Sequence, residues 1–225
     1  MVYVTGDTHG EVWRFDERFF PDQKDMTRDD VVVILGDFGC VWDKYSIEGI
    51  QRLDYLEGKP FTICFVDGNH ENFDRLYNEF EIVDFRGGKA HKIRENVYHL
   101  MRGYIFDFDG QKFFAFGGAS SHDIQVRVNH LSWWKQELPS QEEMDRGEKN
   151  LEAINYKVDF VITHCLPQTI ASELGYFGKD IITEYFDKLL NKGLEFKKWY
   201  CGHYHKSEYY QGKYEVFYAN IERVL

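Results

Sequence analysis

The chain has 225 residues, of which 43% are hydrophobic, 17% aromatic and 29% charged, and only 4 are proline. This composition is typical of an ordered globular protein and excludes a disordered one. The 27 basic and 38 acidic side chains give a formal net charge of −11. A field of this sign repels phosphate backbones and anionic lipids, so it disfavours broad binding to nucleic acid or to a membrane surface.

The four cysteines, Cys40, Cys64, Cys165 and Cys201, are widely spaced and form no CxxC pair. This spacing indicates reduced thiols and favours a cytoplasmic protein. The longest apolar runs, "VVVIL" and "FTICFV", are far shorter than the roughly 18 residues that a membrane span needs. The first residues also lack a basic region followed by a long apolar run, so we expect neither export nor membrane insertion.

Four short runs rich in β-branched and aromatic residues predict buried strands. They cover residues 2–5, 31–35, 61–66 and 158–163. Each run is followed by polar residues: "GDTHG", "GDFG", "DGNHE" and "HCLP". Ligands of α/β sheets bind at the carboxyl ends of the strands, so we expect these four clusters to meet in one crevice.

Helices are predicted where apolar residues recur at helical spacing. Residues 46–57 and 71–80 follow the second and third predicted strands, and residues 181–190 form another amphipathic segment. Ser140 and Glu143 have the spacing of a capping box that opens a further helix. These segments are expected to cover the faces of the sheet.

Two hairpins are predicted, because Asp109-Gly110 and Gln211-Gly212 each separate two aromatic, strand-like runs. Strand–helix alternation combined with hairpins predicts an α/β fold with mixed sheets instead of a purely parallel one. No internal repeat or linker-like segment is visible. We therefore expect a single domain over residues 1–225.

The polar clusters contain the side chains that bind metals. Asp7 and His9 are two residues apart, and so are His203 and His205. Alternate residues of an extended segment share a face, so each pair is expected to reach one site. Carboxylate, imidazole and amide ligands without a thiolate suit Mn²⁺, Fe or Zn²⁺. The complete set of candidate ligands is Asp7, His9, Asp37, Asn69, His164, His203 and His205.

The order of these blocks is Asp-x-His, Gly-Asp, Gly-Asn-His-Glu, His and Gly-His-x-His, from residue 6 to residue 205. It resembles the calcineurin-like metallophosphoesterase superfamily. The resemblance implies two mixed β-sheets packed as a sandwich and flanked by helices, a four-layer fold with two divalent metal ions at the strand ends. It also implies a ligand set: Asp7, His9 and His205 for the first metal, Asn69, His164 and His203 for the second, and Asp37 between them.

The resemblance implies a phosphoesterase and leaves its substrate open; we expect hydrolysis of phosphate monoesters by attack of a hydroxide that bridges the two metals, with Mn²⁺ as the first choice and Fe or Zn²⁺ as alternatives. His70 would protonate the leaving alkoxide or bind a phosphoryl oxygen. Two divalent cations, two carboxylates and one hydroxide leave a charge of about +1 facing the substrate. An acidic protein would thereby gain a local site for anions.

The second block departs from the GDxxDRG pattern of the superfamily's protein phosphatases. It reads "GDFGCVWD", which places Cys40 and Val41 where that pattern has Asp and Arg. "GDFG" followed by "WD" is similar to a bacterial and phage subgroup of small metallophosphoesterases. In the absence of that Asp, we expect either that another group such as Asp43 orients His70 or that His70 is less basic. Cys40 is expected to be a packing residue, with sensitivity to oxidation as the alternative.

A cation that binds phosphate must then come from another segment. One candidate is Arg75, one helical turn beyond "GNHE"; the other is a rim formed by His122, Asp123 and Arg127 in "GGASSHDIQVR". The alternative is that both arginines are solvated. Glu71 is expected to be structural, as an acid in the first turn of a helix.

Two other functions are compatible with the motifs. The same metals would attack a diester, so the protein is alternatively a phosphodiesterase on cyclic nucleotides or on nucleic-acid ends. In that case nucleic acid would be a partner only as a substrate. The lesser alternative is a non-catalytic scaffold of the same fold, although every matched ligand position is filled.

Overall fold

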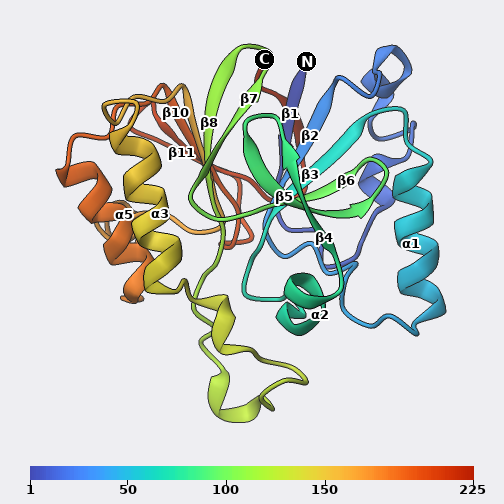
Figure 1. Ribbon diagram of the computed structural model, residues 1–225, viewed down its shortest axis with the longest axis horizontal. Helices are drawn as coiled ribbons and strands as arrows, with labels where there is room; N and C mark the ends of the chain where they lie inside the picture. Colours follow the sequence, from blue (N-terminus) through green and yellow to red (C-terminus); the bar gives the residue numbers. More distant parts are fainter.

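The structure is a computed structural model that describes residues 1–225. Two β-sheets face each other, and helices cover the outer face of each (Figure 1). In this view α1 lies on one side of the sheets, and α3 and α5 lie on the opposite side. This arrangement confirms the α/β fold with two mixed sheets in a four-layer sandwich.

The first sheet has seven strands. Its four central strands are parallel. On one side β13 pairs antiparallel with β1, and on the other β5 pairs antiparallel with β6 and β4 pairs antiparallel with β5. Three of these central strands are the runs predicted at 2–5, 31–35 and 61–66. In spatial order the strands are β13 (Ile221–Arg223), β1 (Val2–Thr5), β2 (Val31–Leu35), β3 (Thr62–Val66), β6 (Val97–Leu100), β5 (Gly88–Arg94) and β4 (Glu81–Phe85).

The second sheet has six strands, and it contains the fourth predicted strand and both predicted hairpins. The β7–β8 turn has Asp109 at φ 55° and Gly110 at φ 75°, as a two-residue hairpin turn requires. In spatial order the strands are β11 (Glu208–Tyr210), β12 (Tyr214–Val216), β10 (Lys198–Cys201), β9 (Phe160–Thr163), β8 (Gln111–Phe116) and β7 (Tyr104–Phe108).

Side-chain caps fix where the helices begin. Ser46 caps α1, and Ser140 and Glu143 form the predicted capping box of α3. None of the helices combines the length and the apolar character that crossing a bilayer would take. The helices are α1 (Ile47–Glu57), α2 (Phe73–Asn78), α3 (Gln141–Glu152), α4 (Gln168–Glu173) and α5 (Ile181–Asn191), with short 3-10 turns η1 (Trp13–Phe15), η2 (Pro21–Asp25), η3 (Ile124–Val126) and η4 (Lys135–Glu137).

Three apolar layers hold the sandwich together. Val33 and Ile162 belong to the layer between the two sheets. Leu53 of α1 packs against the outer face of the first sheet, and Phe186 of α5 packs against that of the second. Burial on both faces explains why the central strands read as continuous apolar runs. The rigid strands deliver the loops that follow them to one edge of the sandwich.

Candidate metal centre

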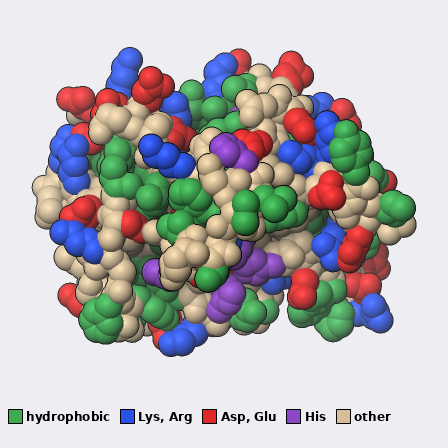
Figure 2. All heavy atoms as spheres, turned by 90° about the horizontal axis from the view of Figure 1, so that it is seen from below, with side chains coloured by type: hydrophobic (Ala, Val, Ile, Leu, Met, Phe, Trp, Pro, Cys, Tyr) green, Lys and Arg blue, Asp and Glu red, His purple; other side chains and the backbone are tan.

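The loops after β1, β2, β3, β9 and β10 meet at one edge of the sandwich. Figure 2 shows histidine side chains gathered near the middle of this face. Each predicted ligand lies in one of these loops: Asp7 and His9 after β1, Asp37 after β2, Asn69 after β3, His164 after β9, and His203 and His205 after β10.

Asp7, His9 and His205 form the first group, with ligand atoms that all lie within 4.8 Å of one another. The Nε2 atoms of His9 and His205 are 3.1 Å apart. Asp7 Oδ2 lies 3.1 Å from His205 Nε2 and 3.8 Å from His9 Nε2. This oxygen is buried and makes no hydrogen bond. Three electron-pair donors thus converge on one point, and a cation there would satisfy all of them.

The second group surrounds His164, whose side chain is fully buried. Its Nε2 lies 3.5 Å from Asp37 Oδ1 and 3.3 Å from Asn69 Oδ1. The His203 ring packs edge-on against it, with ring centroids 4.9 Å apart. The other ring nitrogen, Nδ1, is 2.7 Å from the carbonyl oxygen of Leu35. A hydrogen bond donated from Nδ1 leaves the Nε2 lone pair facing Asp37 and Asn69.

Burial and the neighbouring charges shift the pKa values of the side chains in the centre. Burial opposes ionisation of His164, but Asp37 and Asp7 outweigh it and raise the pKa of His164 to about 10. Burial alone would raise the pKa of Asp37, yet His164 holds that pKa below its ordinary value. Burial lowers the pKa of His203 to about 3. The centre therefore combines two carboxylates with imidazoles in contrasting environments.

The backbone of the centre is bent, which corrects the expectation of extended segments. His9, Asp37, His203 and His205 have φ values of 46°, 48°, 71° and 50°, in the left-handed region that non-glycine residues rarely occupy. Such conformations are unfavourable and cluster at functional sites. The two residues of each pair therefore reach the site through a turn, and alternation along a strand does not place them.

Two motif glycines are required by close approach. A Cβ atom on Gly68 would lie 2.0 Å from Asp37 Oδ1, and one on Gly202 would lie 2.2 Å from Asp7 Oδ1. The space is occupied because each carboxylate accepts a backbone N–H from the neighbouring loop. Asp37 Oδ1 accepts from His70 at 2.8 Å, and Asp7 Oδ1 accepts from His203 at 2.9 Å.

Arg127, one of the predicted substrate contacts, lies directly beside His70. Its Nη1 is 3.4 Å from His70 Nδ1 and its Nη2 is 3.4 Å from His70 Nε2. Asp123 holds the guanidinium through a 2.7 Å contact to Nε. The His70 ring is 5.3 Å from the ring of His9, and burial lowers the pKa of His70. A cation thus stands beside the proposed catalytic histidine.

Two other residues, the candidate phosphate-binding cation Arg75 and the candidate His70 partner Asp43, do not contact His70. Arg75 pairs with Glu79 and lies over the ring of Phe80. Asp43 is exposed, and its carboxylate accepts the backbone N–H of Tyr45, so the expectation that it orients His70 is wrong. Arg127, which directly follows the 3-10 turn at residues 124–126, is the arginine that lies beside His70.

His122 lies on the side of the centre formed by His203, with ring centroids 6.3 Å apart. Both histidines line a cavity of about 360 Å³. Tyr176 and Tyr204, whose rings stack at 4.0 Å, form part of its wall. The candidate centre therefore opens onto a concave, partly aromatic space.

Glu71 is structural, but not as the acid of a first helical turn. Asn72 caps α2, so Glu71 precedes the helix. Its fully buried carboxyl accepts the backbone N–H groups of Phe38 and Gly39, at 2.6 Å and 3.4 Å. Burial raises the pKa of Glu71 well above its ordinary value. Glu71 thus shapes the loop that carries Asp37.

A buried network that the sequence analysis missed supports Asn69. Asn69 Nδ2 donates to Ser121 Oγ at 3.2 Å, and Ser121 donates to the carboxylate of Glu137 at 2.7 Å and 2.8 Å. Arg102 binds the carbonyl of Glu137 and pairs with the fully buried Asp67. The only sign of this network in the sequence is the acidic residue Asp67, directly before "GNHE".

Arg14 was missed in the same way. Its buried guanidinium donates to the carbonyl groups of Gly6, Asp7 and Tyr218, and to Thr5 Oγ1 at 2.7 Å. These bonds satisfy the backbone of the loop that carries Asp7. A lone arginine within "EVWRF" is the only trace of this role in the sequence.

The chain matches one family of known proteins. The family model described as calcineurin-like phosphoesterase matches residues 1–207. No curated protein matches the chain. A crystal structure of a protein assigned as a 5'-nucleotidase from Staphylococcus aureus, in complex with α-ketoglutarate, is similar with 16% identity and a TM-score of 0.49. The match covers 96% of this chain and 47% of that one, so the chain spans about half the length of that structure.

Proposed function

This chain belongs to the calcineurin-like phosphoesterase family, whose members are phosphoric ester hydrolases, and we propose that it hydrolyses phosphate monoesters with two divalent metal ions. One observation carries the proposal: Asp37 lies between the two groups of the centre, with its Oδ2 3.6 Å from His9 Nε2 and its Oδ1 3.5 Å from His164 Nε2.

The residues fit a pair of cations. Asp7 Oδ2 is buried without a hydrogen bond, and the Nε2 atoms of His9 and His205 face each other at 3.1 Å. Bound divalent ions would activate water and offset the charge of the phosphoryl group. The donors are oxygen and nitrogen without sulfur, which supports Mn²⁺. The proposed ligands are Asp7, His9 and His205 for one ion, Asn69, His164 and His203 for the other, and Asp37 for both.

The chain's own residues would handle the substrate. We assign His70 to the leaving-group oxygen or to a phosphoryl oxygen, because its ring lies beside His9 at the rim of the centre. Arg127 would pair with the phosphate, because its only carboxylate partner, Asp123, leaves its other nitrogens beside His70. This pair takes the place of the arginine that the "GDFGCVWD" block lacks.

The cavity beside His122 and His203 supports a small alcohol as the leaving group. Its volume of about 360 Å³ lies at the lower end of the range for small-molecule sites. The net charge of −11 argues against extended nucleic acid as a substrate. The four free, buried thiols are compatible with a reducing, cytoplasmic setting, which we also propose.

The test compares p-nitrophenyl phosphate with bis(p-nitrophenyl) phosphate in the presence of Mn²⁺ and after treatment with EDTA. We expect metal-dependent hydrolysis of the monoester in preference to the diester. His70→Ala should lower kcat by about 10²- to 10⁴-fold with Mn²⁺ still bound. The matched control is His130→Ala, an exposed histidine that pairs with Asp74. Preference for the diester would instead assign a phosphodiesterase, and a metal-loaded protein inert to both esters would contradict the proposal.

A further inference from the structure

A second cavity, larger than the one beside the metal centre, lies elsewhere in the fold. It measures about 890 Å³ and is lined by none of the seven proposed metal ligands. Its walls come from β4 to β6, from residues 129–140 and from α3. A volume of this size is typical of sites for small organic molecules.

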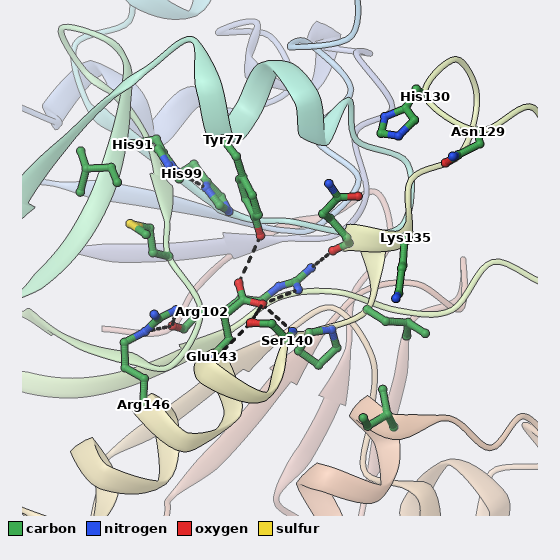
Figure 3. A pocket seen from close by; sticks show the side chains of 16 residues that line it. Tyr77, His91, His99, Arg102, Asn129, His130, Lys135, Ser140, Glu143 and Arg146 are labelled. Atoms are coloured by element: carbon green, nitrogen blue, oxygen red, sulfur yellow. Dashed lines mark hydrogen bonds and ion pairs between the residues drawn. The ribbon is translucent and has the colours of Figure 1, made fainter.

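One wall of this cavity is flat and aromatic. The Tyr77 and His91 rings are stacked at 5.6 Å with an angle of 20°, and the His91 and His99 rings at 5.2 Å with an angle of 6°. Figure 3 shows the three rings side by side. His91 Nδ1 contacts His99 Nδ1 at 2.9 Å, and His99 Nε2 contacts Asp67 at 3.0 Å. These contacts hold the three rings together; His91 and His99 are almost fully buried, so Tyr77 is the ring that offers accessible surface to the cavity.

The cavity carries an excess of positive charge. Arg102 is neutralised by Asp67, and Glu143 is held by Tyr77 and by the cap of α3. Arg146 donates to the carbonyl oxygen of Arg102 and has no carboxylate partner. Lys135 is exposed and makes no ion pair. In Figure 3, Arg146 and Lys135 lie on opposite sides of Glu143.

The neutral part of the lining is apolar. Ile82, Met101, Leu138 and Ile181 contribute to it, and Ile82 is 52% exposed although it lines a cavity. Burial lowers the pKa of His91 to about 3, so its ring is uncharged at neutral pH. The ligand that complements these walls has a flat, largely apolar body and an acidic group.

We propose that this cavity is a second ligand site, and that it binds a small organic anion whose apolar body packs against Tyr77 and Ile82 and whose acidic group faces Lys135. Charge complementarity favours an anion over a neutral ring, because Arg146 and Lys135 have no carboxylate partner, whereas Glu143, the one carboxylate of the lining, pairs with Arg102 at 3.4 Å. The inference does not depend on the proposed function, since the cavity shares no lining residue with the proposed ligands.

The probe is anilinonaphthalene sulfonate, a flat apolar anion whose fluorescence rises on binding, compared with neutral phenylnaphthylamine. Ile82→Trp should fill the cavity and weaken binding of both dyes. Its matched control is Ile47→Trp, at a 74% exposed isoleucine of α1. Lys135→Glu should weaken binding of the anion about fivefold and leave the neutral dye unchanged. Its control is Lys24→Glu, at an exposed lysine of η2.

The site is supported if Ile82→Trp and Lys135→Glu weaken binding of the anionic dye and the two control variants do not. The proposal is overturned if either change has no effect, or if the controls weaken binding equally. A further arm adds saturating inorganic phosphate with Mn²⁺. Displacement of the dye by phosphate would place it at the metal centre and would also overturn the inference.

Discussion

The guanidinium of Arg127 lies beside the imidazole of His70, with Nη1 3.4 Å from Nδ1 and Nη2 3.4 Å from Nε2. Each of the two terminal guanidinium nitrogens therefore faces one ring nitrogen of the histidine. A planar cation can adopt this arrangement, whereas the point charge of a lysine cannot. The pair comes from segments 57 residues apart in the sequence.

We predict that Arg127→Ala lowers kcat/KM for a phosphate monoester by about 10²-fold, because a charge-assisted contact to the phosphoryl group is lost. Arg127→Lys should recover little of this loss. Steady-state kinetics at saturating Mn²⁺ measures both. Arg75→Ala is the control, because Arg75 pairs with Glu79. This change should alter kcat/KM by less than about threefold. Equal losses at the two arginines would contradict this assignment.

Asp7→Asn should weaken binding of Mn²⁺ by at least about 100-fold, because it removes a negative charge between two groups of ligands. The Asn oxygen can still accept the backbone N–H of His203, which contacts Asp7 Oδ1 at 2.9 Å. The fold should therefore survive, and isothermal titration calorimetry measures the affinity. Asp16→Asn, at a surface pair with Arg18, is the control. An unchanged affinity in the Asp7 variant would exclude Asp7 as a ligand.

Arg102→Met should lower the free energy of unfolding by about 3–5 kcal/mol, because it leaves the buried carboxylate of Asp67 without its ion pair. Asp67 has no exposed side-chain surface, and Arg102 holds its pKa at about 2 against the opposing effect of burial. Urea denaturation gives the value. Arg18→Met removes an exposed pair with Asp16 and should cost less than about 1 kcal/mol. Similar costs for the two variants would show that the buried pair is not stabilising.

The native protein should have no reactive thiol. All four cysteines are buried and free, and burial raises the pKa of Cys40 to about 12. The thiolate is the reactive form, so Ellman's reagent should label no cysteine in the native state and four after denaturation. This result would also remove oxidation of Cys40 as a means of inactivation. Rapid labelling of one native thiol is the contrary outcome.

The order of motifs was sufficient to predict the residues that meet at the strand ends, because parallel central strands place successive loops at one edge. Asp7, Asp37 and His164 come together for this reason. The sequence could not predict the turns at His9 and His203, since their left-handed φ values depend on contacts with distant loops. Local spacing therefore identified residues that lie close together in the structure, but it predicted the wrong backbone for them.

The contacts that long loops make could also not be predicted from local sequence patterns. Arg127 approaches His70 because the segment between β8 and α3 folds back over the centre, and no pattern in "GGASSHDIQVR" distinguishes this from a solvated arginine. The partnership of Asp67 and Arg102 depends on tertiary packing in the same way. Charged pairs of this kind need the fold before they can be recognised.

We propose that seven side chains from five loops hold two cations. Crystals grown with Mn²⁺ test it directly by anomalous diffraction. The account predicts two anomalous peaks about 3.5–4 Å apart, one beside Asp7, His9 and His205 and the other beside Asn69, His164 and His203. The absence of peaks there, or a single peak away from Asp7, would contradict it.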